Sequence, residues 1–273
     1  MSPLTDALNR IQAWLQSNYP VVADSITPGL SLEEIQEITQ VLPFSLPDDV
    51  YELYQWSRGH APETQTIYTH MFEPYEGMAL CSLETAIEIL PIFEDEFEEC
   101  AVKYIGKPLF PIFQTDASYL CVVGESDNKE SSPIIFVSEI NETRNRYTSL
   151  TSMMLTLADC FEAGAVSFNE KGYSNWYGEK FASIYLKHNF NLLKFSLKRL
   201  KQELVTTQHD VLRQMTISNF LGDIYSLDRE RRNLVTKRLS FEVIEPLMTA
   251  MQDEDEVIRY LAKQALEELN YTI

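Results

Sequence analysis

Three short apolar segments separated by polar turns most constrain the fold of this chain of 273 residues. LFPIF (109–113), YLCVVG (119–124) and PIIFVSEI (133–140) have the length and the β-branched and aromatic content of strands, and the turns QTDAS and ESDNKESS separate them. MALCSL (78–83) predicts another strand, and a closing helix is expected at about 149–163. This order of helices, strands and a closing helix predicts an α+β fold with an antiparallel-leaning sheet flanked by helices.

Two amphipathic helices are expected before the strands. Apolar residues recur at helical spacing between about residues 4 and 18. The segment NYPVVADSITPG, which contains two prolines and a glycine, is expected to break this helix. A second helix is expected to start at Ser31 and to stop before Pro43, because SLEE forms a capping box between Ser31 and Glu34.

The stretch SLPDDVYELYQWSRG (45–59) predicts a third helix that is rich in aromatic residues. Pro47 suits the first turn of a helix, where its missing N–H is not needed. Asp48 and Asp49 fall in that turn and complement the helix dipole. Gly59 is expected to end the helix in a left-handed conformation.

Two groups of residues are candidates for contact with another protein. Tyr51, Trp56 and Arg58 belong to the residue types enriched at interface hot spots, although Trp56 suits core packing equally well. The second group is an acidic run that comprises Glu94, Asp95, Glu96, Glu98 and Glu99. It lacks the alternating acids, glycine and terminal Glu of a calcium loop, so a solvated face is expected, with a docking site for a basic protein as the alternative.

The negative charge of the chain is large and unevenly distributed. The formal net charge is −19: residues 1–189 contain 10 Lys or Arg and 28 Asp or Glu, a net charge of −18, whereas residues 190–273 contain 12 and 13, a net charge of −1. Such acidity argues against free nucleic acid and against an anionic membrane as partners. The break in charge density indicates two parts, and the acidity serves either solubility or attraction of a basic protein.

The sequence contains none of the motifs that mark a catalytic, metal or cofactor site. It lacks the G-x-S-x-G, Walker A and G-x-G-x-x-G patterns, and its four histidines lack zinc-site spacing. We therefore expect a protein that is not an enzyme and binds no cofactor. Four scattered cysteines, no apolar run near the roughly 18 residues of a membrane span and no signal-peptide pattern in MSPLTDALNR predict a cytoplasmic location.

An ordered series of motifs resembles the SUKH superfamily, which includes the yeast cell-wall-assembly regulator and many bacterial immunity proteins. LSLEEIQEITQVL leads into LPDDVYELYQWSRG; ALCSLETAIEIL, LFPIFQTDASYLCVVG and IIFVSEI with a closing helix then follow in the order of that family. The resemblance covers about residues 29–168. It implies a non-enzymatic domain that binds other proteins, with polar residues near the QTDAS turn, here Asp116, lining a shared cleft.

The C-terminal part is expected to be entirely helical, with helices at about 176–187, 191–205, 208–225, 228–238, 241–252 and 255–269. The segment 241–269 resembles one HEAT-type helical hairpin, in which small alanines allow close packing. The expected division is an N-terminal helix and connector (1–28), the SUKH-like domain (29–168), connecting helices (169–207) and an all-α HEAT-like tail (208–273).

These observations leave two functions from different classes. The first is an immunity-like protein that neutralises a basic toxin by direct binding, which the acidity of residues 1–189 favours because toxin nucleases must be basic to hold nucleic acid. The second is a regulatory or scaffolding protein of the cell-wall-assembly-regulator type, which the helical tail favours. An unrecognised hydrolase is the third and weakest hypothesis, since no nucleophile and base are paired in sequence.

Overall fold

The structure is a computed structural model that describes residues 1–24, 26–59, 78–91, 107–115, 118–127, 129–138, 143–168, 174–176, 180–181, 183–185, 187–189, 217, 244–269 and 271. The chain divides into two compact units, Met1–Ile184 and Tyr185–Ile273. The first unit contains the predicted strands. Within the described residues, no helix is both long and apolar enough to span a membrane.

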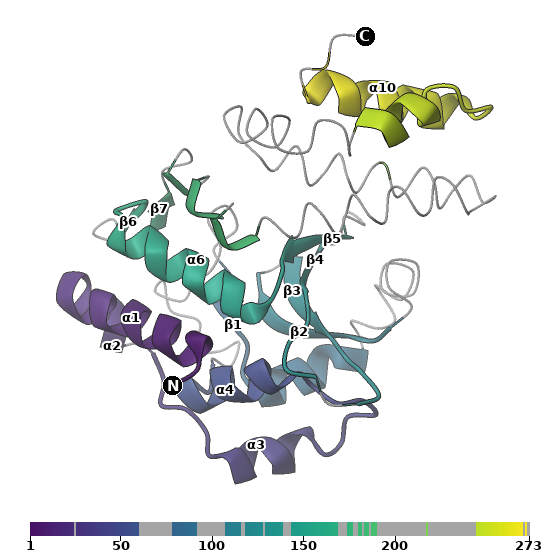
Figure 1. Cartoon of the computed structure of the whole chain (residues 1–273). Helices are drawn as coiled ribbons and strands as arrows, with labels where there is room; N and C mark the ends of the chain where they lie inside the picture. Colours follow the sequence, from purple (N-terminus) through teal and green to yellow (C-terminus); the bar gives the residue numbers. More distant parts are fainter. Residues whose placement is uncertain are drawn as a thin grey trace. The chain divides into compact units, whose positions relative to one another are not determined.

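A five-stranded antiparallel sheet forms the centre of the first unit (Figure 1). Its strands follow one another in sequence order: β1 (Ala79–Leu80), β2 (Leu109–Gln114), β3 (Ser118–Val123), β4 (Ile134–Ser138) and β5 (Thr143–Tyr147). The predicted α+β class and antiparallel sheet are therefore confirmed. The pairing of β2 with β3 shifts register between Pro111 and Phe113, where proline has no N–H to donate.

Strand β5 was not predicted from the sequence. Its residues, TRNRY, are mostly polar and show no run of apolar side chains. It becomes a strand because it pairs with β4, with Phe136 opposite Arg144 and Val137 opposite Thr143. Residues 143–147 therefore form a strand because they pair with β4, and not because their sequence has a high strand propensity.

The sheet is buried on both faces. All five residues of β4 are buried, although successive residues of a strand point to opposite faces. One face carries an apolar cluster of Leu109, Cys121, Val123, Ile135 and Val137, against which Tyr119 packs. The central strands are therefore an inner layer of the unit, which explains their nearly continuous apolar sequences.

The helices that flank the sheet begin and end where local signals place them. They are α1 (Pro3–Asn18), α2 (Pro20–Asp24), α3 (Leu32–Thr39), α4 (Asp48–Trp56), a helix at 83–91 and α6 (Leu150–Glu162). The capping box between Ser31 and Glu34 is formed as predicted. Two details differ from the sequence predictions. The predicted break after α1 is present, and Pro20 in addition starts the short helix α2, because proline fits the first position of a helix.

The second difference concerns the residue at which α4 ends. The helix stops at Trp56 because Ser57 is extended, so Gly59 does not cap it. Gly59 is nevertheless left-handed, with φ of 76°, as the sequence predicted. A Cβ atom at this position would lie 2.2 Å from the carbonyl oxygen of Cys81, so glycine allows the chain after α4 to pass close to β1.

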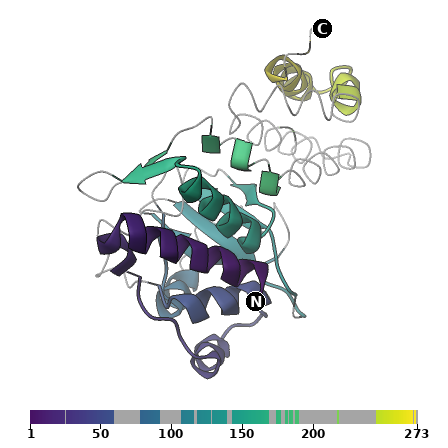
Figure 2. The same ribbon diagram turned by 60° about the vertical axis from the view of Figure 1, so that its left-hand side comes forward.

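Helix α1 is an integral part of the first unit. It runs beside α6, as Figures 1 and 2 both show, and it also contacts α4. Its apolar stripe is fully buried and comprises Leu4, Ala7, Leu8, Ile11 and Leu15. Trp14 stacks on Phe161 with a centroid distance of 4.8 Å, and Arg10 bridges Asp159 and Glu162 of α6.

The first unit also contains a small second sheet. Strand β6 (Val166–Phe168) pairs with β7 (Ser174–Trp176). Described residues between 180 and 189 are helical, in the region where a helix is predicted at about 176–187.

The described part of the second unit ends in a helical hairpin. A helix at 244–250 is followed by a turn and by α10 (Glu256–Glu268), and Asp255 caps α10 by accepting hydrogen bonds from the amides of Val257 and Ile258. These helices confirm those predicted at 241–252 and 255–269. The HEAT-like assignment stays a prediction. The helices predicted at 191–205, 208–225 and 228–238 lie outside the described residues, apart from Ile217.

Candidate protein-binding site around helix α4

The first turn of α4 is hydrogen-bonded to the turn between β3 and β4, here called the β3–β4 turn (residues 124–133). The amide of Asp48 donates to the carbonyl oxygen of Lys129 at 2.8 Å, and the amide of Asp49 donates to that of Glu130 at 3.1 Å. Just before the helix, Ser45 exchanges two main-chain hydrogen bonds with Glu125, of 2.8 and 3.1 Å. These bonds satisfy helix N–H groups for which Pro47 provides no side-chain cap.

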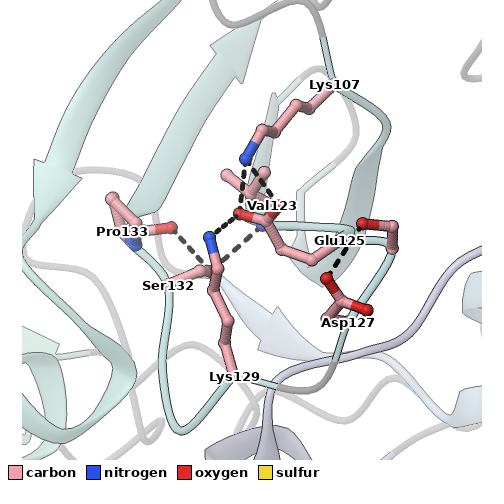
Figure 3. A network of polar contacts seen from close by, with 8 residues as sticks. Lys107, Val123, Glu125, Asp127, Lys129, Ser132 and Pro133 are labelled. Carbon is pink, nitrogen blue, oxygen red and sulfur yellow. Dashed lines mark hydrogen bonds and ion pairs between the residues drawn. The ribbon is translucent and has the colours of Figure 1, made fainter.

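Glu125 organises the charged side chains of this turn (Figure 3). Its carboxylate accepts from the ammonium group of Lys107 at 2.5 and 2.7 Å and from that of Lys129 at 2.5 Å. Hydrogen bonds from Lys107 and then Lys129 hold the pKa of Glu125 below its ordinary value. Behind it, the hydroxyl of Ser132 accepts from the amide of Val123 at 3.1 Å and donates to the carbonyl oxygen of Pro133 at 3.2 Å.

Asp49 differs from every other acid of this region. Asp49 is only 5% exposed, and neither of its carboxylate oxygens has a partner within hydrogen-bond distance. Burial raises the pKa of Asp49 to about 7, the negative charges of Glu52 and Asp48 add to the rise, and the Ser131 hydroxyl opposes it. Asp48, one residue earlier, is exposed. Both acids lie in the first turn of α4, as predicted, but only Asp48 is exposed there.

Glu52 connects α4 to the start of α1. Its carboxylate accepts from the hydroxyls of Ser2 and Thr5 and from the amide of Thr5, the last at 2.8 Å. Ser2 is also the N-cap of α1. An acid at the N-terminus of a helix is favourable because it lies near unsatisfied N–H groups.

The aromatic and basic residues predicted as partner contacts lie on α4 and just after it. Tyr51 and Trp56 are half-buried, and the Trp56 indole N–H donates to the side chain of Gln12 on α1 at 3.3 Å. Arg58 is exposed and lies 3.5 Å from Glu84. The structure thus places Trp56 and Arg58 at the C-terminal end of one helix, and their role in binding stays a prediction.

The remaining predicted contacts lie outside the described residues. They are Asp116 and the acidic run Glu94, Asp95, Glu96, Glu98 and Glu99. Sequence reasoning also missed the Glu125 network. The four-residue spacing of Glu125 and Lys129 in ESDNK was a usable signal for their ion pair, whereas Lys107 is brought in by the fold.

Side chains that could bind a metal ion do not converge in the described part of the chain. No three His, Cys, Asp or Glu residues there form a group that could hold a metal ion. Cys81, Cys121 and Cys160 are buried free thiols, and burial raises the pKa of Cys81 to about 12. Because the thiolate is the reactive form, Cys81 is not poised for catalysis at neutral pH.

The fold and this site define an α+β domain in which a Leu-Pro-acid helix docks on the turn of an antiparallel sheet. Residues 29–162 match the model of the SMI1 / KNR4 family (SUKH-1). The matched region runs from just before α3 to the last residue of α6, so residues 29–162 form a SUKH-1 domain. No curated protein matches the chain.

The matched family indicates the general class of function. Domains of this family are in general non-catalytic immunity or regulatory modules, and they act through contacts with other proteins. The resemblance predicted from the sequence is confirmed. Helix α1 lies outside the matched residues, yet it packs on α4 and α6 of the matched domain.

Proposed function

We propose that this protein is an immunity-like protein that neutralises a basic toxin by binding it directly in the cytoplasm. The observation that carries the proposal is the net charge of −18 over residues 1–189, a segment that contains the whole SUKH-1 domain. A field of this sign attracts cationic proteins and speeds their association. Toxin enzymes that act on nucleic acid present such a cationic surface.

Helix α3 and the start of α4 offer an acidic surface for this role. The chain has no Lys or Arg between Arg10 and Arg58. On α3, which lies on the outer side of α4 (Figure 1), the side chains of Glu33, Glu34 and Glu37 are exposed. Leu32 and Val41 are exposed beside them, so apolar contact can accompany charge pairing.

The residues predicted as contacts fit the same proposal. Arg58 and the half-buried Trp56 follow this acidic stretch at the end of α4, and Tyr51 lies on the same helix. Asp116 and the acidic run of residues 94–99 are proposed as additional contacts with the basic partner.

Capture of partners by the full chain tests the proposal. The chain is used as bait at low and at physiological salt, and bound proteins are identified by mass spectrometry. A matched pair of variants locates the contact: Glu33→Gln with Glu37→Gln on α3, and Glu254→Gln with Glu267→Gln in the second unit. One basic partner that is lost at higher salt and with the α3 variant supports the proposal. A partner that is acidic, or that both variants bind equally at all salt concentrations, contradicts it.

A regulatory or scaffolding role is the second candidate, and the second compact unit favours it. Tyr185–Ile273 forms a body of its own with nearly balanced charge, which binding by the acidic domain alone does not require. Under this alternative, the same capture yields several partners, and the second-unit variant loses them while the α3 variant keeps them.

A further inference from the structure

The joint between α4 and the β3–β4 turn contains a buried acid, Asp49, that forms no ion pair with the described cations. Both oxygens of Asp49 lack hydrogen bonds, although the amide of the same residue is bonded across the joint to Glu130. A buried neutral carboxyl without a partner is tolerated at moderate cost. A buried carboxylate without a partner costs far more, so ionisation of Asp49 acts against the closed joint.

The Lys and Arg side chains around this joint form ion pairs with acids other than Asp49. In the β3–β4 turn, Lys129 is held by Glu125, which also holds Lys107. On α1, Arg10 is held by two acids of α6. Within the described parts of the elements that pack against α4, each Lys or Arg therefore already has an acid partner.

Two acids of α4, Glu52 and Asp48, make ionisation of Asp49 less favourable still, and the elements around α4 contain other acids. Asp48 and Glu52 are its neighbours on α4, and Glu130 lies in the facing turn. The helices that contact α4 add further acids: Asp6 on α1, Glu33, Glu34 and Glu37 on α3, and Asp159 and Glu162 on α6. With the cations paired and the nearby charge negative, only the Ser131 hydroxyl favours the ionised form of Asp49, and burial outweighs it.

We propose that Asp49 is a protonation-dependent latch: its neutral carboxyl allows the first turn of α4 to stay closed on the β3–β4 turn, and its ionisation releases that joint. Release breaks the hydrogen bonds from Asp48 to Lys129 and from Asp49 to Glu130 and admits water to the carboxylate. This inference is independent of the proposed toxin binding.

The expected effect follows from proton linkage. If the open joint returns the Asp49 carboxyl to water, its pKa falls from about 7 to an ordinary value near 3.8. The opening constant then rises with pH between these two values and levels off above pH 7. Between pH 5 and pH 7, the increase is about fiftyfold.

Amide hydrogen exchange of the full chain, measured residue by residue and corrected for the intrinsic effect of pH, tests the latch. The reporter amides are those of Ser45 and Asp48, which bond across the joint, and a reference amide is that of Leu120 in the central strand β3. We expect opening at the reporters to increase by tens of fold from pH 5 to pH 7. In Asp49→Asn this increase is lost, whereas in the matched control Asp48→Asn it persists at Ser45.

Three results would overturn the latch. One is a reporter opening constant that stays the same from pH 5 to pH 7. Another is an increase that survives in Asp49→Asn, which would assign it to a different group. The last is an opening constant at the reporters that equals the one at Leu120 at each pH, which would mean that the joint opens only in global unfolding.

Discussion

Asp49→Asn replaces a buried carboxyl by an uncharged amide of nearly the same size. The side chain has no hydrogen bond to lose, and the helix amides on either side of the joint keep their main-chain acceptors. The variant therefore changes the charge that the folded state must hold at high pH and little else.

The size of the effect follows from the pKa of Asp49 in the two states. Folding raises this pKa from 3.8 to about 7. The wild-type protein has the full stability of the neutral carboxyl below pH 4, and it loses that contribution as the pH rises through about 7. At about 1.4 kcal/mol for each pKa unit, the loss above pH 7 is on the order of 4 kcal/mol. Asparagine does not titrate, so the variant avoids the loss.

Urea unfolding of both proteins at pH 4 and pH 8 measures this difference. We expect Asp49→Asn to be more stable than the wild type by several kcal/mol at pH 8. At pH 4 it is equal or slightly less stable, because the Asn amide is itself buried without a partner. Asp48→Asn, at the exposed neighbouring position, serves as the control and changes stability little at either pH. A difference between variant and wild type that is the same at both pH values would refute the reasoning.

Three further predictions concern stability. Leu8→Ala, in the buried stripe of α1, lowers the free energy of unfolding by about 2–5 kcal/mol in urea titrations, and a loss below 1 kcal/mol would show that α1 is not part of the cooperative unit. Gly59→Ala destabilises more than Gly164→Ala, because both residues have positive φ but only the first meets a carbonyl oxygen; equal melting temperatures would contradict this. Glu125→Gln lowers the free energy of unfolding by about 1 kcal/mol or less near pH 7. This loss becomes smaller in 1 M salt, and also as the pH falls through the lowered pKa of Glu125. A loss of stability that does not depend on salt would exclude the ion pairs as its cause.

Much of the fold was predictable because its signals are local. The capping box at Ser31 and Glu34, the apolar period of α1 and the turn-bounded apolar segments each act within a few residues. Their order along the chain was sufficient to predict the SUKH-like domain, which the match to residues 29–162 confirms.

Other features depend on partners that are distant in sequence. The polar strand β5 exists because β4 offers it an edge to pair with. The N-terminal helix was assigned to a separate segment with its connector, yet its buried stripe packs on α6, about 150 residues later in the chain. Neither pairing leaves a local mark, since each depends on which surfaces the rest of the fold brings near.

The two acids at the start of α4 show most clearly what the sequence determines and what the tertiary structure determines. The sequence by itself determined that a helix begins after Pro47 and that acids occupy its first turn, because proline geometry and the helix dipole act locally. It could not distinguish Asp48 from Asp49, which are the same residue type in adjacent positions. Only the tertiary structure decided that Asp48 is exposed and Asp49 is buried, because burial depends on which segments the fold brings to each side of the helix, such as the β3–β4 turn bonded to this first turn.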